Sequence, residues 1–291
     1  MVPERESGDS VGVGSGSGCE EMGGRILNAI LKYPGSKWRI ASWVISHMPK
    51  HACYVEPFFG SGAVFFNKPP SSHEVINDVD HNVVNLMQVI RDHNDQLCEM
   101  ISLTPWAREE FGRSYDSATT DPIEKARRFL VRCWQAHGRK PGVRTGWRRK
   151  SVVNSSTTVG LWRKLPDRLQ AAVERLMCSE IESTDALKLI PDYNHPDVLI
   201  YADPPYLAET RSGRQYACEL QSKKEHLELL SVLLEHRGPV LLSAYPSPVY
   251  DEALQGWESV TCENLAEKGK TSTEVLWMNE KVGRNQLRLF I

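Results

Sequence analysis

The feature that most constrains this chain is a nearly continuous apolar run, Val198 to Tyr201, that leads directly into Asp203-Pro204-Pro205-Tyr206. Such a run is typical of a parallel strand that is buried on both faces of its sheet. In an open α/β sheet, ligands bind beyond the carboxyl ends of the strands. We therefore expect the four residues after the run to lie in a binding site.

Strand and helix signals alternate in the first part of the chain, which is the order of a doubly wound α/β sheet. Tyr33 to Ser36 has the composition of a turn. The periodicity of apolar residues and the turn signals predict, in order, a helix at 37–48, a strand at 53–55, a helix from Ala63, a strand at 73–76 and an amphipathic helix at 81–91.

The rest of the chain differs in pattern. Residues 1–24 are rich in Gly, Ser and Glu and predict a disordered tail, because they cannot bury enough apolar surface to offset the entropy of ordering. Strand signals fade over residues 96–179 and return at 197–201, 239–243 and in the C-terminal region. The simplest division is an α/β domain formed by 25–95 and 180–291, with a helical insertion at 96–179.

A glycine-containing loop, Glu56 to Gly62, follows the first predicted strand. Gly60 and Gly62 let the backbone approach a ligand closely. Asp78, at the end of the next strand, can accept hydrogen bonds from ribose hydroxyls. The loop is neither a GxGxxG fingerprint nor a phosphate loop, so S-adenosylmethionine, which lacks phosphates, fits it better than NAD or ATP. A tight turn without a ligand is the alternative.

The Asp203 to Tyr206 segment suits the methylation of an exocyclic amino group. Its two prolines make a rigid loop and leave the Pro204 carbonyl free to accept a hydrogen bond. If Asp203 and this carbonyl accept the two amino hydrogens, the nitrogen lone pair becomes localised and developing positive charge is stabilised. Tyr206 offers a ring on which an extruded base can stack. No metal is needed, and a plain proline turn is the alternative.

These motifs resemble the Dam-like adenine-N6 DNA methyltransferases with the alpha order of motifs. The resemblance lies in Lys32 to Lys37, in the EPFxGxG loop Glu56 to Gly62, in Asn77-Asp78 and in the DPPY run Asp203 to Tyr206. It implies a Rossmann-like S-adenosylmethionine-dependent methyltransferase sheet, with a helical target-recognition insertion. It also implies that adenine is the target, which the four catalytic residues alone do not decide.

The resemblance assigns site residues as well. It implies that Tyr33 and Lys37 contact the cofactor and that Asp78 holds its ribose. Asp185 stands where the family contacts the cofactor adenine, although Ala186 replaces the aromatic residue that commonly follows. The implied cofactor-binding residues are Tyr33, Lys37, Phe58, Gly60, Gly62, Asp78, Asp185 and Asp203, and the implied catalytic residues are Asp203, Pro204 and Tyr206.

The insertion carries a basic segment that predicts binding to nucleic acid. Residues 125–168 hold thirteen Lys or Arg and one acid, in a chain whose formal net charge is −2. Lys and Arg neutralise phosphates, and interleaved Trp134, Trp147 and Trp162 can stack or wedge against bases. A solvated helix face is the alternative. The residues expected to bind DNA are Arg139, Lys140, Arg144, Trp147, Arg148, Arg149 and Lys150.

Three hypotheses follow for the function. The first is an adenine-N6 methyltransferase of double-stranded DNA that works as a cytoplasmic monomer in a bacterium or for a phage, with a partner restriction endonuclease left open. The second keeps the chemistry on cytosine N4 or on RNA, and the third is a catalytically silent nucleic-acid-binding protein. No apolar run is long enough to cross a membrane. The seven scattered cysteines predict free thiols and no metal site.

Overall fold

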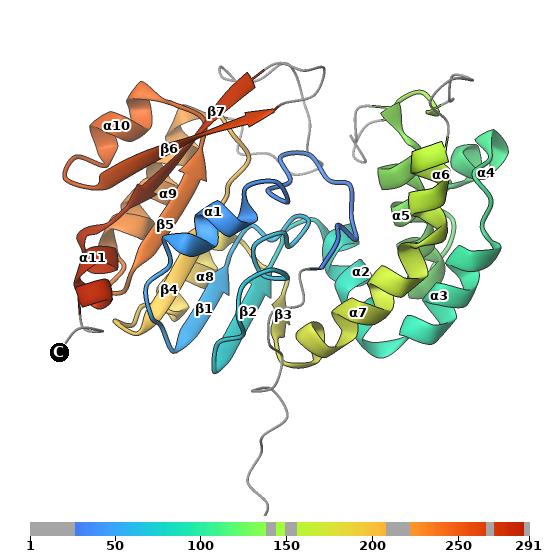
Figure 1. Ribbon diagram of the computed structural model, residues 1–291, viewed down its shortest axis with the longest axis horizontal. Coiled ribbons are helices and arrows are strands. Elements are labelled where there is room, and N and C mark those ends of the chain that lie inside the picture. Colours follow the sequence, from blue (N-terminus) through green and yellow to red (C-terminus); the bar gives the residue numbers. More distant parts are fainter. Residues whose placement is uncertain (1–26, 138–143, 149–155, 208–221, 266–270, 288–291) are drawn as a thin grey trace, which may run out of the picture.

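The structure, a computed structural model, describes residues 27–137, 144–148, 156–207, 222–265 and 271–287 (Figure 1). A twisted sheet with helices on both faces forms one side of the molecule, and a group of helices stands beside it (Figure 1). The predicted tail, 1–24, lies outside the described residues. None of the described helices is long and apolar enough to span a membrane.

Seven strands form one sheet in the order β3-β2-β1-β4-β5-β7-β6. The first five strands in this order are parallel, and β7 pairs antiparallel with both β5 and β6. This confirms the predicted doubly wound α/β class, with antiparallel strands at one edge. The strands are β1 (Cys53–Glu56), β2 (His73–Asn77), β3 (Glu180–Glu182), β4 (Val198–Ala202), β5 (Val240–Ala244), β6 (Glu258–Leu265) and β7 (Thr271–Met278).

The central strands are buried on both faces, as their continuous apolar sequences predicted. Every residue of β4 and of β5 is buried. Because side chains alternate across a strand, neighbouring residues enter different cores. Tyr54, Leu199 and Leu241 pack on one face of the sheet, whereas Val55 and Ile200 pack on the other.

The helices that flank the sheet lie on separate faces of it. The core that contains Val55 and Ile200 also takes apolar residues from α8, α9 and α10, and these helices lie together in Figure 1. Helix α1 packs into the opposite core. The bounds of these helices are Ala41–Ser46 for α1, Ala186–Asp192 for α8, Lys223–Glu235 for α9 and Pro248–Ala253 for α10, and α11 follows β7 at Glu280–Leu287.

The region predicted as a helical insertion is helical. It contains α3 (Asn94–Leu103), α4 (Arg108–Arg113), α5 (Pro122–Gln135), α6 (Ser156–Arg163) and α7 (Leu165–Met177). Helix α2 (His81–Asp92) packs against α5 and α7. A single core therefore runs from one face of the sheet into the helical group, where the Trp134 indole donates to the Ile30 carbonyl. The predicted boundary at residue 96 falls within α3, and the division into two domains stays a prediction.

A buried ion cluster joins α7 to the sheet. Glu74 of β2 accepts hydrogen bonds from Lys68 and from Arg175 of α7, and all three side chains are at most 4% exposed. Arg175 also donates to the Phe65 carbonyl at 2.9 Å. The end of the helical insertion is thus held against the segment that follows the glycine loop.

Three local predictions differ from the structure. The helix expected over 37–48 is confined to α1, and residues 37–40 form a turn. The helix expected from Ala63 is replaced by turns, because Pro69 and Pro70 cannot continue a helix that starts so close to them. The expectation of free thiols throughout is wrong at Cys178, which is disulfide-bonded; spacing along the chain does not reveal which cysteines folding brings together. Cys53, Cys98, Cys133 and Cys262 are free thiols.

Candidate active site

A cavity of about 240 Å³ opens at the carboxyl ends of β1, β2 and β4. It lies where an open α/β sheet is expected to bind a ligand. Its wall includes predicted residues from five separate parts of the chain: Tyr33, Lys37, Phe58, Gly60, Asp78, Asp185 and Asp203. Gly62, Pro204 and Tyr206 do not line this cavity, although their direct neighbours Ser61, Ala63 and Pro205 do.

The two glycines of the loop have positive φ angles, 50° for Gly60 and 63° for Gly62. Other residues rarely adopt this conformation. A Cβ atom at Gly62 would lie 2.3 Å from the Phe59 ring, and one at Gly60 would lie 3.3 Å from the Tyr33 ring. Gly62 is therefore required by packing behind the cavity, whereas Gly60 forms part of the cavity wall.

Asp78 is joined to the glycine loop. Its carboxylate accepts a hydrogen bond from the Gly60 amide at 2.7 Å and another from the Asp80 amide at 2.8 Å. Burial raises the pKa of Asp78 to about 7. No ion pair to Asp78 is recorded in the described part of the chain. A buried acid in a cavity wall, without a cation beside it, suits hydrogen bonds from ligand hydroxyl groups.

Tyr33 and Asp185 also line the cavity. The Tyr33 hydroxyl donates to Asp80 at 3.1 Å. Asp185 is the N-cap of α8, and its side chain accepts from the Leu187 amide at 2.9 Å. Capping is a sufficient structural reason for an aspartate here, so the cofactor-adenine contact assigned to Asp185 stays a prediction.

Lys37 and Asp203 form a direct ion pair across the site. The Lys37 ammonium lies 2.7 and 2.8 Å from the two Asp203 oxygens, and it also donates to the Gly35 carbonyl at 2.9 Å. Ser243, at the end of β5, donates to Asp203 at 3.0 Å. Burial raises the pKa of Asp203 to about 6, although Lys37 opposes this effect. The carboxylate is therefore ionised at neutral pH and oriented by two donors.

Tyr206 packs beside the Lys37–Asp203 ion pair. Its hydroxyl contacts the Lys37 ammonium at 2.5 Å and donates to Glu274 of β7. Its ring lies 4.4 Å from the ring of Tyr245, which follows β5, and its exposed fraction is 6%. In this conformation the ring faces neighbouring side chains, and the stacking of an extruded base on it stays a prediction.

Glu274 is a site residue that sequence reasoning missed. It is 3% exposed, and it lies 3.4 Å from the Lys37 ammonium. The sequence predicts only strand character in this C-terminal region, with no site residue. An acid at the start of an apolar, buried strand was nevertheless a signal, because a buried carboxylate needs a partner.

The cavity is acidic, which decides the kind of ligand that it can hold. Glu56, at the end of β1, lines it together with Asp78, Asp185 and Asp203, against the single cation Lys37 among its lining residues. Burial raises the pKa of Glu56 to about 8, so this carboxyl keeps its proton at neutral pH until a cationic ligand lowers that pKa. A ligand with positive charge, ribose hydroxyls and an apolar ring fits this set of groups. S-adenosylmethionine has all three, so the residues fit the cofactor that the sequence predicted.

The basic segment is only partly described. Arg139, Lys140, Arg149 and Lys150 lie outside the described residues. Of the other predicted DNA-binding residues, Arg144 is exposed, with its guanidinium 5.4 Å from the centre of the Tyr115 ring. Trp147 donates to the Gln135 side chain at 3.1 Å, and the Arg148 amide donates to the Gln135 carbonyl at 2.7 Å. These contacts hold residues 144–148 against the end of α5.

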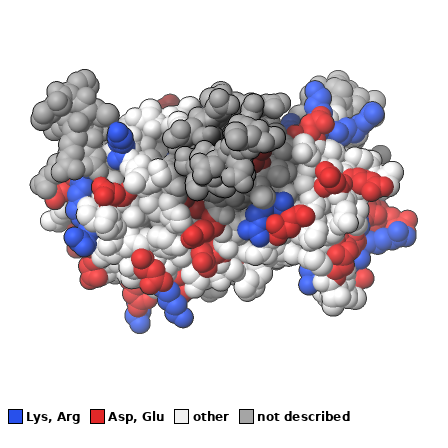
Figure 2. Space-filling model, turned by 90° about the horizontal axis from the view of Figure 1, so that it is seen from below, with Lys and Arg blue, Asp and Glu red and all other residues white. Residues whose placement is uncertain are grey.

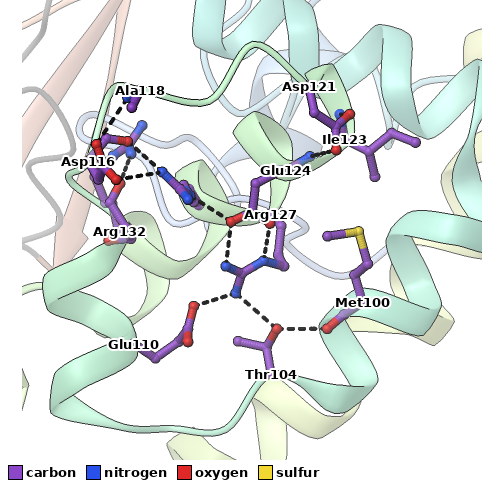
Figure 3. Close-up of polar contacts among 12 residues, drawn as sticks. Met100, Thr104, Glu110, Asp116, Ala118, Asp121, Ile123, Glu124, Arg127 and Arg132 are labelled. Carbon is purple, nitrogen blue, oxygen red and sulfur yellow. Dashed lines mark hydrogen bonds and ion pairs between the residues drawn. The ribbon is translucent and has the colours of Figure 1, made fainter.

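Other basic residues of the segment are used within the protein. Arg127 contacts Glu124 and Glu110, and Arg128 also contacts Glu124 (Figure 3). Arg132 donates to the Ser114 carbonyl. These three arginines stabilise the packing of α4 and the α4–α5 connection on α5, so the number of basic residues overstates the charge available to a nucleic acid.

Two of the three tryptophans are core residues. Trp134 is 0% exposed and Trp162 is 3% exposed, with the Trp162 indole donating to the Thr104 carbonyl. The expectation that they stack on bases is wrong, because helix packing covers both rings. Trp147 remains half-buried. On the face seen from below, acidic and basic side chains are interspersed (Figure 2).

The topology, the glycine loop and the acidic cavity define a Rossmann-like protein with a site for a nucleoside-containing cation. The model of the D12 class N6 adenine-specific DNA methyltransferase family matches residues 33–270, and the chain belongs to this family. The resemblance seen in the motifs is confirmed.

Individual relatives match over different lengths. The chain is 30% identical to a DNA adenine methylase of Escherichia coli K12 over 113 residues, which is 35% of this chain and 38% of the relative. It is 26% identical to a type II methyltransferase of Lactococcus lactis subsp. cremoris over 273 residues, covering 85% of this chain and 91% of the relative. A solved S-adenosylmethionine-dependent methyltransferase of Agrobacterium tumefaciens aligns with a TM-score of 0.35 at 12% identity, over 84% of this chain and 60% of that one.

Proposed function

We propose that the protein transfers a methyl group from S-adenosylmethionine to the N6 amino group of adenine in double-stranded DNA. The observation that carries the proposal is Asp203. It is an oriented, ionised carboxylate at the edge of a nucleoside-sized acidic cavity, directly before two prolines.

The cofactor would occupy the acidic cavity. In this arrangement Asp78 accepts the ribose hydroxyls, and Phe58 and Gly60 border the ligand. Lys37, Tyr33 and the carboxylates of the wall face its charged methionine end. When bound, the cofactor supplies an activated methyl group on a sulfonium, which needs no metal and no covalent enzyme intermediate.

The protein would act on the target nitrogen by hydrogen bonding. The lone pair of an adenine amino group is delocalised into the ring, so the amine is a poor nucleophile. Asp203 and the Pro204 carbonyl accept its two hydrogens, which localises the lone pair and stabilises the positive charge that develops on nitrogen. Asp203 then holds the proton that the nitrogen loses, which its pKa of about 6 permits.

The target base must leave the duplex to reach Asp203. Tyr206 and the nearby Tyr245 are the aromatic residues next to Asp203 whose rings can border an extruded base, once Tyr245 moves from its position 4.4 Å away. Arg144, Trp147 and Arg148, with the predicted Arg139, Lys140, Arg149 and Lys150, are proposed to contact the DNA. We propose that the protein acts as a monomer in the cytoplasm.

A methylation assay tests the proposal. The protein is incubated with labelled S-adenosylmethionine and duplex DNA from a host without adenine methylation, and the labelled nucleosides are identified after digestion. We expect N6-methyladenine. Label in N4-methylcytosine, label only in RNA offered in parallel, or no transfer would each refute the proposed substrate.

Asp203→Asn is the critical variant. It keeps the size of the side chain but removes the charge that accepts the amino hydrogens, so transfer is expected to fall by at least about 10²-fold. Asp192→Asn, on the exposed side of α8, is the matched control and is expected to retain wild-type activity. Full activity of the Asp203 variant would show that the catalytic assignment is wrong.

A further inference from the structure

Glu274 lies outside the motifs that carry the family resemblance, yet it contacts Lys37 and Tyr206 beside Asp203. It lies on β7, which is antiparallel to β5 and far along the chain from Lys37 and Asp203. The register places Ala244 opposite Val275, so Glu274 follows the carboxyl end of β5, next to the segment Ser243 to Tyr245. β7, which lies between β5 and β6 in the sheet, thus brings a carboxylate to the site.

The contacts of Glu274 are with the two residues that border Asp203. It accepts a hydrogen bond from the Tyr206 hydroxyl and lies 3.4 Å from the Lys37 ammonium. Tyr206 and Lys37 also contact each other, at 2.5 Å. The Lys37 ammonium therefore lies between two carboxylates, Asp203 at 2.7 Å and Glu274 at 3.4 Å.

This geometry matters because Lys37 competes for the acceptor sites of Asp203. The ammonium contacts both Asp203 oxygens, and those oxygens are the ones that must accept hydrogens from a target amine. A lone Lys–Asp pair would be neutral and its acceptor oxygens largely occupied. A second carboxylate shares the ammonium and leaves the group of three with a net negative charge.

We propose that Glu274 is a positioning residue for Asp203: it draws the Lys37 ammonium and the Tyr206 hydroxyl toward β7, so that Asp203 keeps acceptor capacity and negative charge for the target amine. The inference rests on the proposed function, because it concerns how Asp203 engages that amine. Glu274 acts through its neighbours and does not itself touch the substrate.

The electrostatic surroundings of Asp203 support this role. The carboxylate of Glu274 raises the pKa of Asp203, in addition to burial, and Lys37 lowers it. Several further groups face Asp203 or interact with it electrostatically. They are Glu56 from β1, Tyr201 from β4, Tyr245 after β5 and Tyr250 from α10. Glu274 differs in making direct contacts, because it lies 3.4 Å from the Lys37 ammonium and accepts a hydrogen bond from the Tyr206 hydroxyl.

The test is the pH dependence of single-turnover methyl transfer to unmethylated duplex DNA, with enzyme and S-adenosylmethionine in excess. Wild-type transfer is expected to fall on the acid side as Asp203 becomes protonated. In Glu274→Gln the neighbouring negative charge is lost, so this acid limb is expected to move down by roughly one pH unit. The plateau rate is expected to fall by about tenfold or more, because Lys37 then binds Asp203 alone.

Two further variants make the result specific. Glu274→Asp retains the charge but withdraws it by one methylene, so its acid limb is expected between those of wild type and Glu274→Gln. Glu258→Gln, at an exposed position on β6 opposite Met278, removes an acid at the other end of the same strand pair and is expected to match wild type. Thermal unfolding and the affinity for S-adenosylmethionine are measured for all variants, and both are expected to change little.

The outcomes separate the inference from the proposed function. A wild-type protein that transfers no methyl group to adenine refutes the proposed function itself. An active wild type whose acid limb is unmoved in Glu274→Gln refutes the positioning role, even if the plateau rate falls. If Glu274→Gln does not fold, an acid limb of Glu274→Asp identical to that of wild type, with an undiminished rate, refutes it equally.

Discussion

The free energy of unfolding should depend on the balance of charges in the buried cluster of Glu74, Lys68 and Arg175. Two cations share one carboxylate, and the three side chains are at most 4% exposed. Arg175→Met removes a cation and leaves Lys68 paired with Glu74. Glu74→Gln removes the anion and leaves two cations buried together. Both substitutions delete the Arg175–Glu74 ion pair, but Glu74→Gln also deletes the Lys68–Glu74 pair, so the two should differ in cost.

The magnitudes follow from the contacts that each variant loses. Arg175→Met loses a charge-assisted bond to Glu74 and a bond to the Phe65 carbonyl, which together are worth about 2 kcal/mol of unfolding free energy. Glu74→Gln leaves uncompensated buried charge, for which about 3–5 kcal/mol is expected. Burial already lowers the pKa of Lys68, and Glu74 opposes that effect. In Glu74→Gln this pKa falls further, so the unfolded chain binds more protons and the cost shrinks as pH rises.

Urea unfolding followed by circular dichroism at several pH values measures both effects. Glu99→Gln, at an exposed position on α3, is the control and should change the unfolding free energy by less than about 0.5 kcal/mol. A Glu74→Gln cost no larger than that of Arg175→Met would refute the charge-counting argument. So would a cost that grows with pH.

Three other measurements test the site. Burial raises the pKa of Glu56 to about 8, of Asp78 to about 7 and of Asp203 to about 6, so the folded protein holds these protons more tightly than the unfolded chain. The unfolding free energy of the cofactor-free protein should therefore fall by several kcal/mol as pH rises from about 4 to 8. Urea titrations that find rising stability over this range would contradict this. Asp78→Asn should weaken S-adenosylmethionine binding about tenfold or more in calorimetry, through the lost hydroxyl contacts, and unchanged affinity would exclude the ribose role. Arg144→Gln should lower the slope of log affinity for DNA against log salt by about one, whereas Arg113→Gln on α4 should leave it unchanged; equal slopes would place Arg144 away from the phosphates.

The sequence predicted which edge of the sheet holds the cavity, and the reason is physical. The apolar run Val198 to Tyr201 predicts a buried parallel strand, and Asp203 must then lie at the carboxyl end of that strand. The same holds for Asp78 after β2. Local patterning and the handedness of the fold therefore bring these two acids to one edge without further information.

Contacts between distant segments had no such signal. Lys37 and Asp203 are 166 residues apart, and nothing in either segment encodes their ion pair. Glu274 enters the site only because β7 pairs with β5 in one register. The basic segment gave a wrong prediction for a different reason. Composition alone does not show that Trp134 is buried whereas Trp147 is half-buried. The spacing of Ala126, Leu130 and Trp134 along α5 would have placed Trp134 on the buried face.

The anchoring of α7 has a consequence for how the two ligands would influence each other. Arg175 belongs to the last turns of the helical region, yet it donates to the Phe65 carbonyl, next to Val64 in the cavity wall. A displacement of α7 would therefore move a side chain that is hydrogen-bonded beside the cavity wall. By linkage, any change that one ligand makes in the affinity for the other is returned in equal measure. The order in which DNA and cofactor bind would then alter the kinetics of assembly but leave the stability of the ternary complex the same.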